Sequence, residues 1–395
     1  MKIRYIDKQG DLNQLLEYLA QKPAFAFDLE FDKNRYQYGF TMCLMQVFDG
    51  SVCYIIDPLA PGLDITSVFP LMSNPEIQKL GFELGEDLRL FHSMQCPVKN
   101  IYDVSIASKL LDHSQISLVN AIDRILGLAT SKGSQKSNWV KRPLSETQIN
   151  YAAEDVLHLF DLKSALEVTL RERGMLDWVE QERELLERIE SAEQDGMSHL
   201  KPRDSNGFSQ ADWHVVKGLM ELREQLAEQH NRPAYQVLDK EYLFELAKDD
   251  AALKAFHQKA RPLRSLNSEA FKQQLKEEVA QLRQDAEERG LESNELAFPR
   301  QSKDEIRRVK AQKKAEEENI ESYMKPIQSS LKNALGEHAA IFILGNRLMR
   351  ELVSGDQSNL VPYKSQLVIE HADLAGVDLS AIGLNLDAKQ SKLKG

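Results

Sequence analysis

Cysteine is scarce in this chain of 395 residues. The three cysteines, Cys43, Cys53 and Cys96, are widely spaced, lie in apolar surroundings and include no Cys-x-x-Cys pair. This usage argues against a disulfide framework and against a cysteine-based zinc site. It fits a reducing compartment, so we expect a cytoplasmic protein.

Long hydrophobic runs are missing as well. Residues 1–7 lack the apolar stretch of a signal peptide, and runs such as 339–344 are far too short to span a bilayer. We therefore expect a protein that is neither secreted nor embedded in a membrane.

The chain also lacks an excess of positive charge, because its formal net charge is −11. Bulk charge therefore does not favour a protein that coats nucleic acid, although local basic patches can accompany an acidic metal site. Hydrophobic residues make up 42% of the chain, and the 19 glycines bring the apolar share close to that of folded proteins. At this length we expect two or three domains.

The first part of the chain alternates strand and helix patterns. Strands are predicted at 2–6, 24–31, 42–48, 52–56 and 77–82, and helices at 12–19, 66–72, 86–94, 104–111 and 118–126. This order predicts an α/β domain over residues 1–170, with a mixed sheet flanked by helices.

The rest of the chain has helical patterns. A Ser-x-x-Gln capping box at Ser145 starts a helix, and Ser209 and Asp239 are expected to cap later helices. Three regions are predicted: a helical linker over 171–208, an all-helical domain over 209–285, and a second, degenerate helical domain over 300–386.

Basic residues gather at two places in this helical part. The first place contains Lys259, Arg261 and Arg264, and the second is the run 300–314, which includes Arg307, Arg308 and Lys310. Both could contact the phosphate backbone of a nucleic acid. For the second run, a solvated helix with i,i+4 ion pairs explains the pattern equally well.

Two carboxylates stand close together on the predicted strand 24–31. Because side chains alternate along a strand, the phenylalanines of this segment would face one way and Asp28 and Glu30 the other. Neighbouring carboxylates repel each other unless a cation lies between them, and hard oxygen ligands suit Mg2+ or Mn2+. A strand that ends at a polar rim would show the same pattern, so a metal site requires further acids.

Three more residues can converge on such a site. A two-metal phosphodiesterase needs about four carboxylates from separate elements. Tyr151 and Asp155 stand four positions apart on a predicted helix and therefore share one face. Asp87 opens a predicted helix, where the helix dipole would also favour an acid without any metal. Asp103 is expected to be a helix N-cap rather than a fifth ligand.

The ordered set Asp28-x-Glu30, Asp87 and Tyr151-x-x-x-Asp155 resembles the DEDD exonucleases, in the subgroup in which a tyrosine precedes the last aspartate by four positions. The likeness to the ribonuclease D family extends through the segments MCLMQV (42–47), WVKRPLS (139–145) and YAAEDV (151–156). The segments LREQ (222–225) and PAYQVL (233–238) resemble the HRDC domain that follows the catalytic domain in that family. One departure is Phe82, where family members commonly carry a histidine.

The resemblance implies a ribonuclease-H-like exonuclease fold followed by HRDC-type helical domains, and two divalent cations, Mg2+ or Mn2+, as cofactors. Asp28, Glu30 and Asp155 would hold the metal that carries the attacking water, while Asp28 and Asp87 would fix the second metal. Tyr151 would orient the water. The implied activity is 3′–5′ hydrolysis of RNA to nucleoside 5′-monophosphates, trimming the 3′ ends of tRNA precursors and other small structured RNAs.

Two alternatives stay open. The carboxylates do not sense a 2′-hydroxyl by themselves, so the chain could be a 3′–5′ exodeoxyribonuclease. It could also be a non-catalytic nucleic-acid-binding scaffold whose metal site has decayed. We expect a monomer in which the chemistry lies before residue 156 and the helical region holds the RNA.

Overall fold

The computed structural model describes residues 2–114, 117–129, 137–190, 200–298 and 302–386. Contacts divide the chain into two compact units. Unit 1 contains residues 1–30, 42–191 and 306–395, and unit 2 contains residues 31–41 and 192–305. Unit 1 is therefore discontinuous in the sequence, since most of unit 2 is inserted before its last segment.

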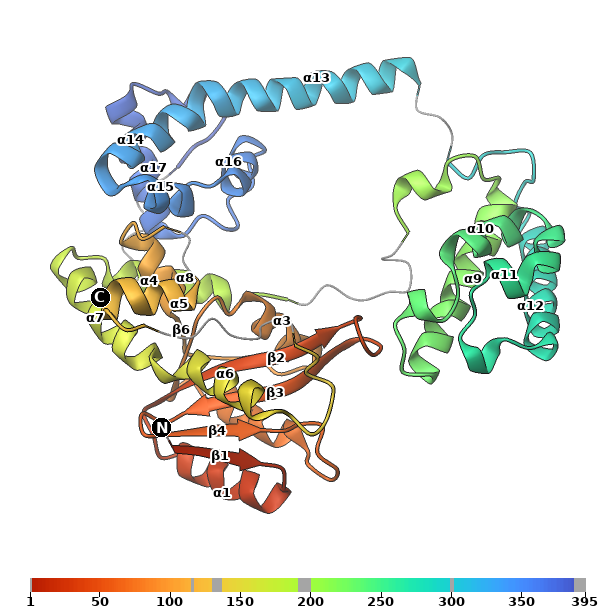
Figure 1. Ribbon diagram of the computed structural model, residues 1–395. Helices are drawn as coiled ribbons and strands as arrows, with labels where there is room; N and C mark the ends of the chain where they lie inside the picture. The colour runs from red at the N-terminus through yellow and green to blue at the C-terminus, as the bar shows by residue number, and fades with distance from the viewer. Residues whose placement is uncertain (1, 115–116, 130–136, 191–199, 299–301, 387–395) are drawn as a thin grey trace. The chain divides into compact units, whose positions relative to one another are not determined.

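Unit 1 is built on a mixed six-stranded sheet (Figure 1). The strands are β1 (Lys2–Ile6), β2 (Ala24–Lys33), β3 (Phe40–Phe48), β4 (Val52–Ile56), β5 (Gln78–Gly81) and β6 (Ile101–Asp103). Their order across the sheet is β1-β4-β3-β2-β5-β6. The pairs β1/β4, β2/β5 and β5/β6 are parallel, whereas β3/β4 is antiparallel. The predicted mixed sheet is confirmed.

Eight helices accompany the sheet in the described residues before 190. They are α1 (Gln9–Leu19), α2 (Phe69–Met72), α3 (Gly85–Ser93), α4 (Val104–Leu110), α5 (Leu118–Ala121), α6 (Glu146–Leu157), α7 (Leu159–Glu172) and α8 (Leu176–Leu186). The predicted helix 66–72 is a 3-10 turn, Ile65–Val68, followed by α2. Pro70 explains the break, because it has no N–H to continue the α-helical pattern from the preceding turn. The predicted helix 118–126 continues beyond α5 as a single π-helical turn.

The last helices of the chain belong to the same unit as the sheet. They are α13 (Lys303–Asn319), of which all but the first turn lies in unit 1, α14 (Lys325–Leu335), α15 (Glu337–Ile343), α16 (Asn346–Val353) and α17 (Pro362–Ala375). One hydrophobic core includes Leu44 and Ile55 of the sheet together with Ile327 and Val368 of these helices. Residues 306–386 therefore complete the core of unit 1, and their likeness to a second HRDC domain stays a prediction.

Two polar joints connect these helices to the sheet region. The Asp112 carboxylate accepts hydrogen bonds from the backbone N–H groups of His338 (2.7 Å) and Ala339 (3.2 Å) at the start of α15. A Cβ at Gly336, which has a φ of 98°, would collide with that carboxylate. This joint therefore requires glycine at position 336.

The second joint is a buried ion pair between α8 and α17. The Lys364 ammonium lies 2.7 Å from Glu182, and the Tyr363 hydroxyl donates a 2.5 Å hydrogen bond to the same carboxylate. The Tyr363 ring also stacks on Trp178 with ring centroids 4.7 Å apart. Because the charges satisfy each other away from water, the pair fixes how α17 meets α8.

Unit 2 is a small helical domain with its own core. Its α-helices are α9 (Gln210–Gln229), α10 (Lys240–Lys248), α11 (Phe256–Lys259) and α12 (Glu269–Glu288). The predicted caps are confirmed, because the Ser209 side chain accepts from the Asp212 N–H and the Asp239 side chain from the Tyr242 N–H. None of the helices described in either unit is both long enough and apolar enough to cross a membrane.

Candidate active site

Strand β2 carries the first two predicted site residues. Phe25, Phe27 and Leu29 are buried, while Asp28 and Glu30 remain partly exposed. The opposite face of the strand is also covered, since Ala26 is fully buried in the shared core. Asp28 and Glu30 therefore lie on a face of β2 that is buried at Ala26 and becomes partly exposed at the two acids.

Helix α6 brings the second pair of residues to the same place. The capping box predicted at Ser145 is present, with the Ser145 hydroxyl accepting from the Gln148 N–H and the Gln148 side chain accepting from the Ser145 N–H. Ala152 and Ala153 are fully buried and let the helix approach closely. Tyr151 and Asp155, one turn apart, then lie on the side that faces the acids of β2.

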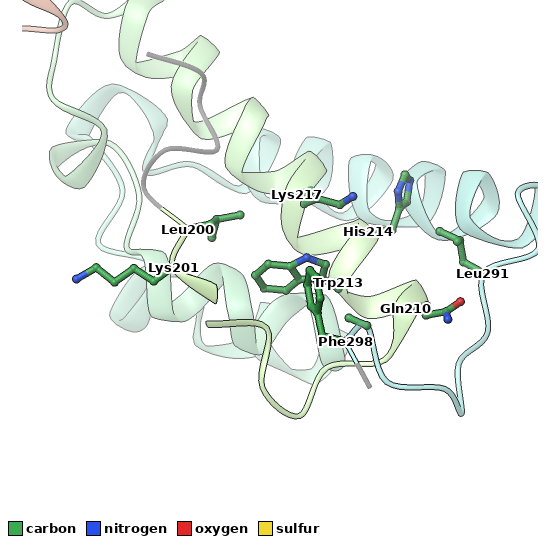
Figure 2. Close-up of a pocket in the computed structure, with 9 residues that line it drawn as sticks. Leu200, Lys201, Gln210, Trp213, His214, Lys217, Leu291 and Phe298 are labelled. Atoms are coloured by element: carbon green, nitrogen blue, oxygen red, sulfur yellow. The ribbon is translucent and has the colours of Figure 1, made fainter. Parts of the chain in front are cut away.

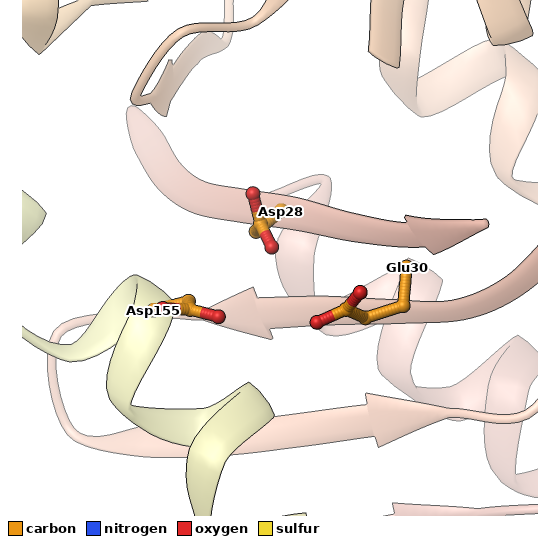
Figure 3. A group of neighbouring side chains, drawn as sticks. All are labelled: Asp28, Glu30 and Asp155. Carbon is orange, nitrogen blue, oxygen red and sulfur yellow. The ribbon is translucent and has the colours of Figure 1, made fainter. Parts of the chain in front are cut away.

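Three carboxylates meet between these elements. Asp28, Glu30 and Asp155 each offer one oxygen, and these oxygens all lie within 4.8 Å of one another. Figure 3 shows the three side chains pointing toward a common space between β2 and α6. This spacing suits a divalent cation bound by oxygen atoms.

Asp87 lies beside this group. It stands in the first turn of α3, is 5% exposed, and its charge raises the pKa of both Asp28 and Glu30. Its Oδ1 atom is buried and has no hydrogen-bond partner within the described part of the chain. If Asp87 only stabilised the start of the helix, its buried oxygen would be expected to accept a hydrogen bond. A bound cation is therefore the better explanation of Asp87.

The acids strongly perturb one another. Burial, followed by the charges of neighbouring acids, raises the pKa of Asp28 well above its usual range and that of Glu30 to about 9. Burial also raises the pKa of Asp87 to about 8 and that of Asp155 to about 7. No lysine or arginine of the described residues forms an ion pair with any of the four. The residues present therefore fit bound divalent cations, which would supply the missing positive charge.

Tyr151 contributes a protonated hydroxyl to this site. Its pKa is raised by burial and by the charges of Asp155, Glu30 and Asp28, and it forms a hydrogen bond with Asp155. A phenol held in this way stays neutral at physiological pH. It can therefore donate a hydrogen bond but cannot act as a base.

Comparison with known proteins gives this site a family. Residues 3–171 match the protein family described as 3′-5′ exonuclease. The chain is 33% identical to ribonuclease D of Shewanella sp. (strain ANA-3) over 184 residues, which cover 46% of this chain and 47% of that protein. It is 30% identical to ribonuclease D of Gluconacetobacter diazotrophicus over 243 residues, covering 60% and 61%. Residues 3–171 therefore form a 3′-5′ exonuclease domain that is similar to the corresponding part of ribonuclease D. Its matched part spans about half to three-fifths of these relatives.

Solved structures extend the likeness of the fold. Escherichia coli RNase D, an exoribonuclease involved in structured RNA processing, superposes with a TM-score of 0.64 at 20% identity, covering 95% of this chain and 98% of that one. The catalytic core of RRP6 from Trypanosoma brucei gives a TM-score of 0.58 at 23% identity, covering 72% and 80%. The predicted architecture, an exonuclease-type α/β domain followed by helical segments, is thus confirmed.

Asp103 has the structural role predicted for it. Its carboxylate caps α4 by accepting from the Ser105 N–H, and it also accepts from the N–H groups of Glu83 and Leu84. These bonds occupy both of its oxygens. Asp103 therefore fixes the turn that precedes α3, and with it the position of Asp87.

The predicted RNA-contact residues belong to both units. Lys259 pairs with Glu245 at 2.7 Å, beside Asp239 and Glu241. Arg261 and Arg264 are exposed in unit 2, whereas Arg307, Arg308 and Lys310 are exposed on α13. Arg307 and Lys310 stand three positions apart and share a face of α13, from which Arg308 is turned by about 100°. Their contact with nucleic acid stays a prediction.

A different surface of unit 2 combines aromatic and basic side chains. A pocket of about 540 Å³ contains no acid among the residues described there (Figure 2). Its lining combines aromatic, basic, polar and apolar side chains: Trp213, Phe298, Lys201, Lys217, Gln210, His214, Leu200, Leu291 and Ala297. Phe298 is 61% exposed. The sequence did not predict this pocket, because its lining residues come from three separate segments of the chain.

Proposed function

We propose that this chain is a 3′–5′ exoribonuclease that hydrolyses RNA from its 3′ end to nucleoside 5′-monophosphates with two divalent cations. The observation that carries the proposal is the meeting of Asp28, Glu30 and Asp155 oxygens within 4.8 Å, inside a segment that matches the 3′-5′ exonuclease family. A cluster of acids that repel one another, with no lysine or arginine paired to them, is typical of a site for metal ions.

Each acid has a separate part in holding the ions. Asp28, Glu30 and Asp155 would bind one cation, and Asp28 would share a second with Asp87, whose buried Oδ1 lacks a protein partner. When bound, the ions supply positive charge that makes water a better nucleophile and stabilises the charge on the phosphate and on the departing 3′ oxygen. The carboxylates must be ionised to hold them, so binding displaces the protons that their raised pKa values retain.

Tyr151 would orient the attacking water. Its neutral hydroxyl lies among Asp28, Glu30 and Asp155, whose charges raise its pKa, so it donates a hydrogen bond and does not remove a proton. The hydroxyl has a single proton, which Asp155 accepts in this structure. When Asp155 holds a cation, that proton would instead bond one lone pair of the water, leaving the other directed toward phosphorus. The proton lost by that water would pass to solvent or to an acid of the cluster.

The substrate we propose is structured RNA with a 3′ extension, such as a tRNA precursor. The ribonuclease D relatives and the RNase D structure described as an exoribonuclease support this class. The acid-free pocket of unit 2 supports it as well, because aromatic faces and lysines are suited to an unpaired nucleotide and its phosphate. A 3′–5′ exodeoxyribonuclease remains the second candidate, since the acids themselves do not contact a 2′-hydroxyl.

One experiment compares RNA and DNA strands of a single sequence, both with single-stranded 3′ extensions, in Mg2+, Mn2+ or EDTA. We expect stepwise shortening of the RNA from its 3′ end, release of nucleoside 5′-monophosphates, and no cleavage in EDTA. Faster cleavage of the DNA strand would favour the exodeoxyribonuclease. Binding of either strand without cleavage in any metal would identify a scaffold and contradict the proposal.

A further inference from the structure

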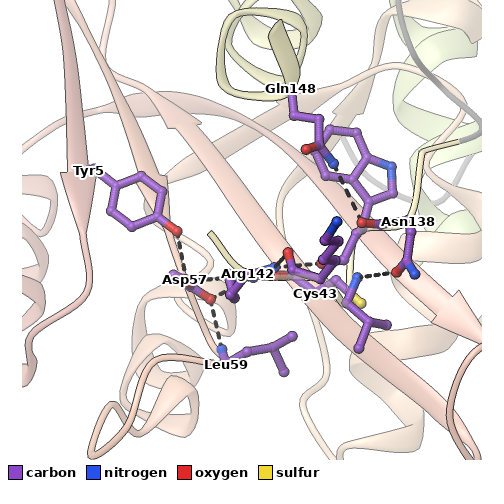
Figure 4. A network of polar contacts seen from close by, with 10 residues as sticks. Tyr5, Cys43, Asp57, Leu59, Asn138, Arg142 and Gln148 are labelled. Carbon is purple, nitrogen blue, oxygen red and sulfur yellow. Dashed lines mark hydrogen bonds and ion pairs between the residues drawn. The ribbon is translucent and has the colours of Figure 1, made fainter. Parts of the chain in front are cut away.

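The loop before α6 is fastened to the sheet by one arginine. Arg142 donates from Nε and Nη2 to the two carboxylate oxygens of Asp57, both at 2.6 Å, and from Nη2 to the Cys43 carbonyl at 2.7 Å (Figure 4). Asp57 directly follows β4, and Cys43 lies on β3. A two-pronged pair of this kind fixes the direction of the guanidinium as well as its distance.

Asp57 is itself held in place. It is 4% exposed and accepts further hydrogen bonds from the Tyr5 hydroxyl (2.7 Å) and the Leu59 N–H (3.0 Å). Burial would raise the pKa of Asp57, but the hydrogen bonds from Arg142 and Tyr5 hold it below the usual range. The carboxylate is therefore ionised at neutral pH and remains a firm anchor for Arg142.

The other side of Arg142 holds the backbone of its own loop. Nη1 donates to the carbonyls of Trp139 (2.6 Å) and Lys141 (3.1 Å). An arginine has five N–H donors, and the partners of Arg142 account for all five. No donor is left for a phosphate, so Arg142 has no direct contact to offer the substrate.

The tethered loop packs on the proposed water-orienting residue. Trp139 is 3% exposed, and its ring centroid lies 6.1 Å from that of Tyr151. A hydrogen bond from the Gln148 side chain to the Asn138 carbonyl (3.5 Å) closes the loop onto α6. The Tyr151 ring thus rests against an indole whose backbone Arg142 fixes.

We propose that Arg142 and Asp57 are positioning residues, which hold Trp139 against Tyr151 and thereby set the direction of the Tyr151 hydroxyl toward the acids. The inference rests on the role proposed for Tyr151 above. Small displacements of a group that orients a reactant reduce turnover steeply, up to about 100-fold for 1 Å. The pair should therefore affect kcat through Tyr151 while leaving the binding of RNA unchanged.

A double-mutant cycle tests this. Arg142→Lys keeps the charge but loses the two-pronged geometry, and Tyr151→Phe keeps the ring but loses the hydroxyl. We expect Arg142→Lys to lower kcat roughly tenfold with KM within about twofold of wild type. In the Tyr151→Phe background the same change should have no further effect, because the hydroxyl it positions is gone.

If the wild type cleaves RNA and the two substitutions lower kcat by factors that multiply in the double variant, the positioning role is wrong but the proposed function stands. A wild-type chain that cleaves no RNA would instead overturn the proposed function. Arg183→Lys is the matched control, because Arg183 is similarly buried and paired with Glu180 and Glu187. We expect it to leave kcat unchanged. If thermal unfolding shows that Arg142→Lys does not fold, Asp57→Asn replaces it in the same cycle with the same expected pattern.

Discussion

The clustered acids of the candidate site in unit 1 and the paired acids of unit 2 have opposite pKa shifts. In unit 2, hydrogen bonds from cationic partners lower the pKa of Asp204, Glu269 and Asp285, with Lys240, His257 and Arg289 as the first partners. In the cluster of unit 1, burial and then the charges of neighbouring acids raise the pKa of Asp28, Glu30 and Asp155. An acid with a cationic protein partner stabilises a fold, whereas a recessed acid without a cationic partner is available to a ligand.

Replacing one acid in each unit gives the largest contrast. Asp28→Asn should lower kcat by at least about a thousandfold, because it removes the carboxylate shared by both proposed ions. It should not lower the melting temperature in EDTA, since it relieves repulsion. Asp285→Asn should leave kcat unchanged and lower the melting temperature slightly. Near-normal turnover with Asp28→Asn would contradict the assignment of Asp28 as a metal ligand. Unfolding of this variant would show that Asp28 is needed for the fold.

Ion pairs give a second contrast, in stability. Lys364→Met leaves Glu182 charged and buried, so we expect the free energy of unfolding to fall by about 3–5 kcal/mol. Lys259→Gln breaks the pair with Glu245, whose side chains are 56% and 51% exposed, and should cost less than about 1 kcal/mol. Urea unfolding measures both. Adding Glu182→Gln to Lys364→Met should restore most of the loss, and a failure to do so would contradict the buried-charge explanation.

The raised pKa values predict how stability depends on pH. Between the unfolded values near 4 and the folded values of about 7 for Asp155, 8 for Asp87 and 9 for Glu30, the folded chain binds more protons than the unfolded chain. The melting temperature in EDTA should therefore fall as pH rises through this window. Mg2+ should raise it most at the alkaline end, where the acids are free of protons. The Asp28→Asn chain should show a weaker slope, and equal slopes with and without Mg2+ would contradict the cluster.

The smallest expected effect concerns the pocket of unit 2. Phe298→Ala should weaken binding of 3′-extended RNA about fivefold if a base stacks there, without changing the salt dependence, because no charge is lost. Tyr235→Ala is the matched control, since Tyr235 is equally exposed (61%) and lies outside the pocket. Filter binding at two salt concentrations measures both variants. Equal losses in the two would exclude a specific role for the pocket.

Local rules account for what could be predicted from the sequence. Strand alternation placed Asp28 beside Glu30, helical spacing placed Tyr151 with Asp155, and capping chemistry identified Ser145 and Asp103. Each of these relations spans a few residues, so the backbone pattern alone determines it. The convergence of the acids then followed from the family resemblance and not from spacing.

Long-range pairs account for what could not be predicted. Arg142 lies 85 positions from Asp57, and Tyr363 lies 181 positions from Glu182. No local pattern marks such partners, because a buried pair depends on how distant elements pack. Local patterns also gave no sign that helices beyond 306 complete the core of unit 1. The expected site residues lie before 156, but the unit that holds them includes these later helices.

The discontinuity of unit 1 also governs the order in which a newly synthesised chain can fold. Residues of the sheet leave the ribosome before most of unit 2, and α14 to α17 emerge only after unit 2. Since domains fold as units during synthesis, unit 2 can fold before the helices that complete the core of unit 1 have been synthesised. A chain whose translation stops before these helices would carry the acids without the segment that completes their core, so unit 1 can mature only after α14 to α17 have been synthesised.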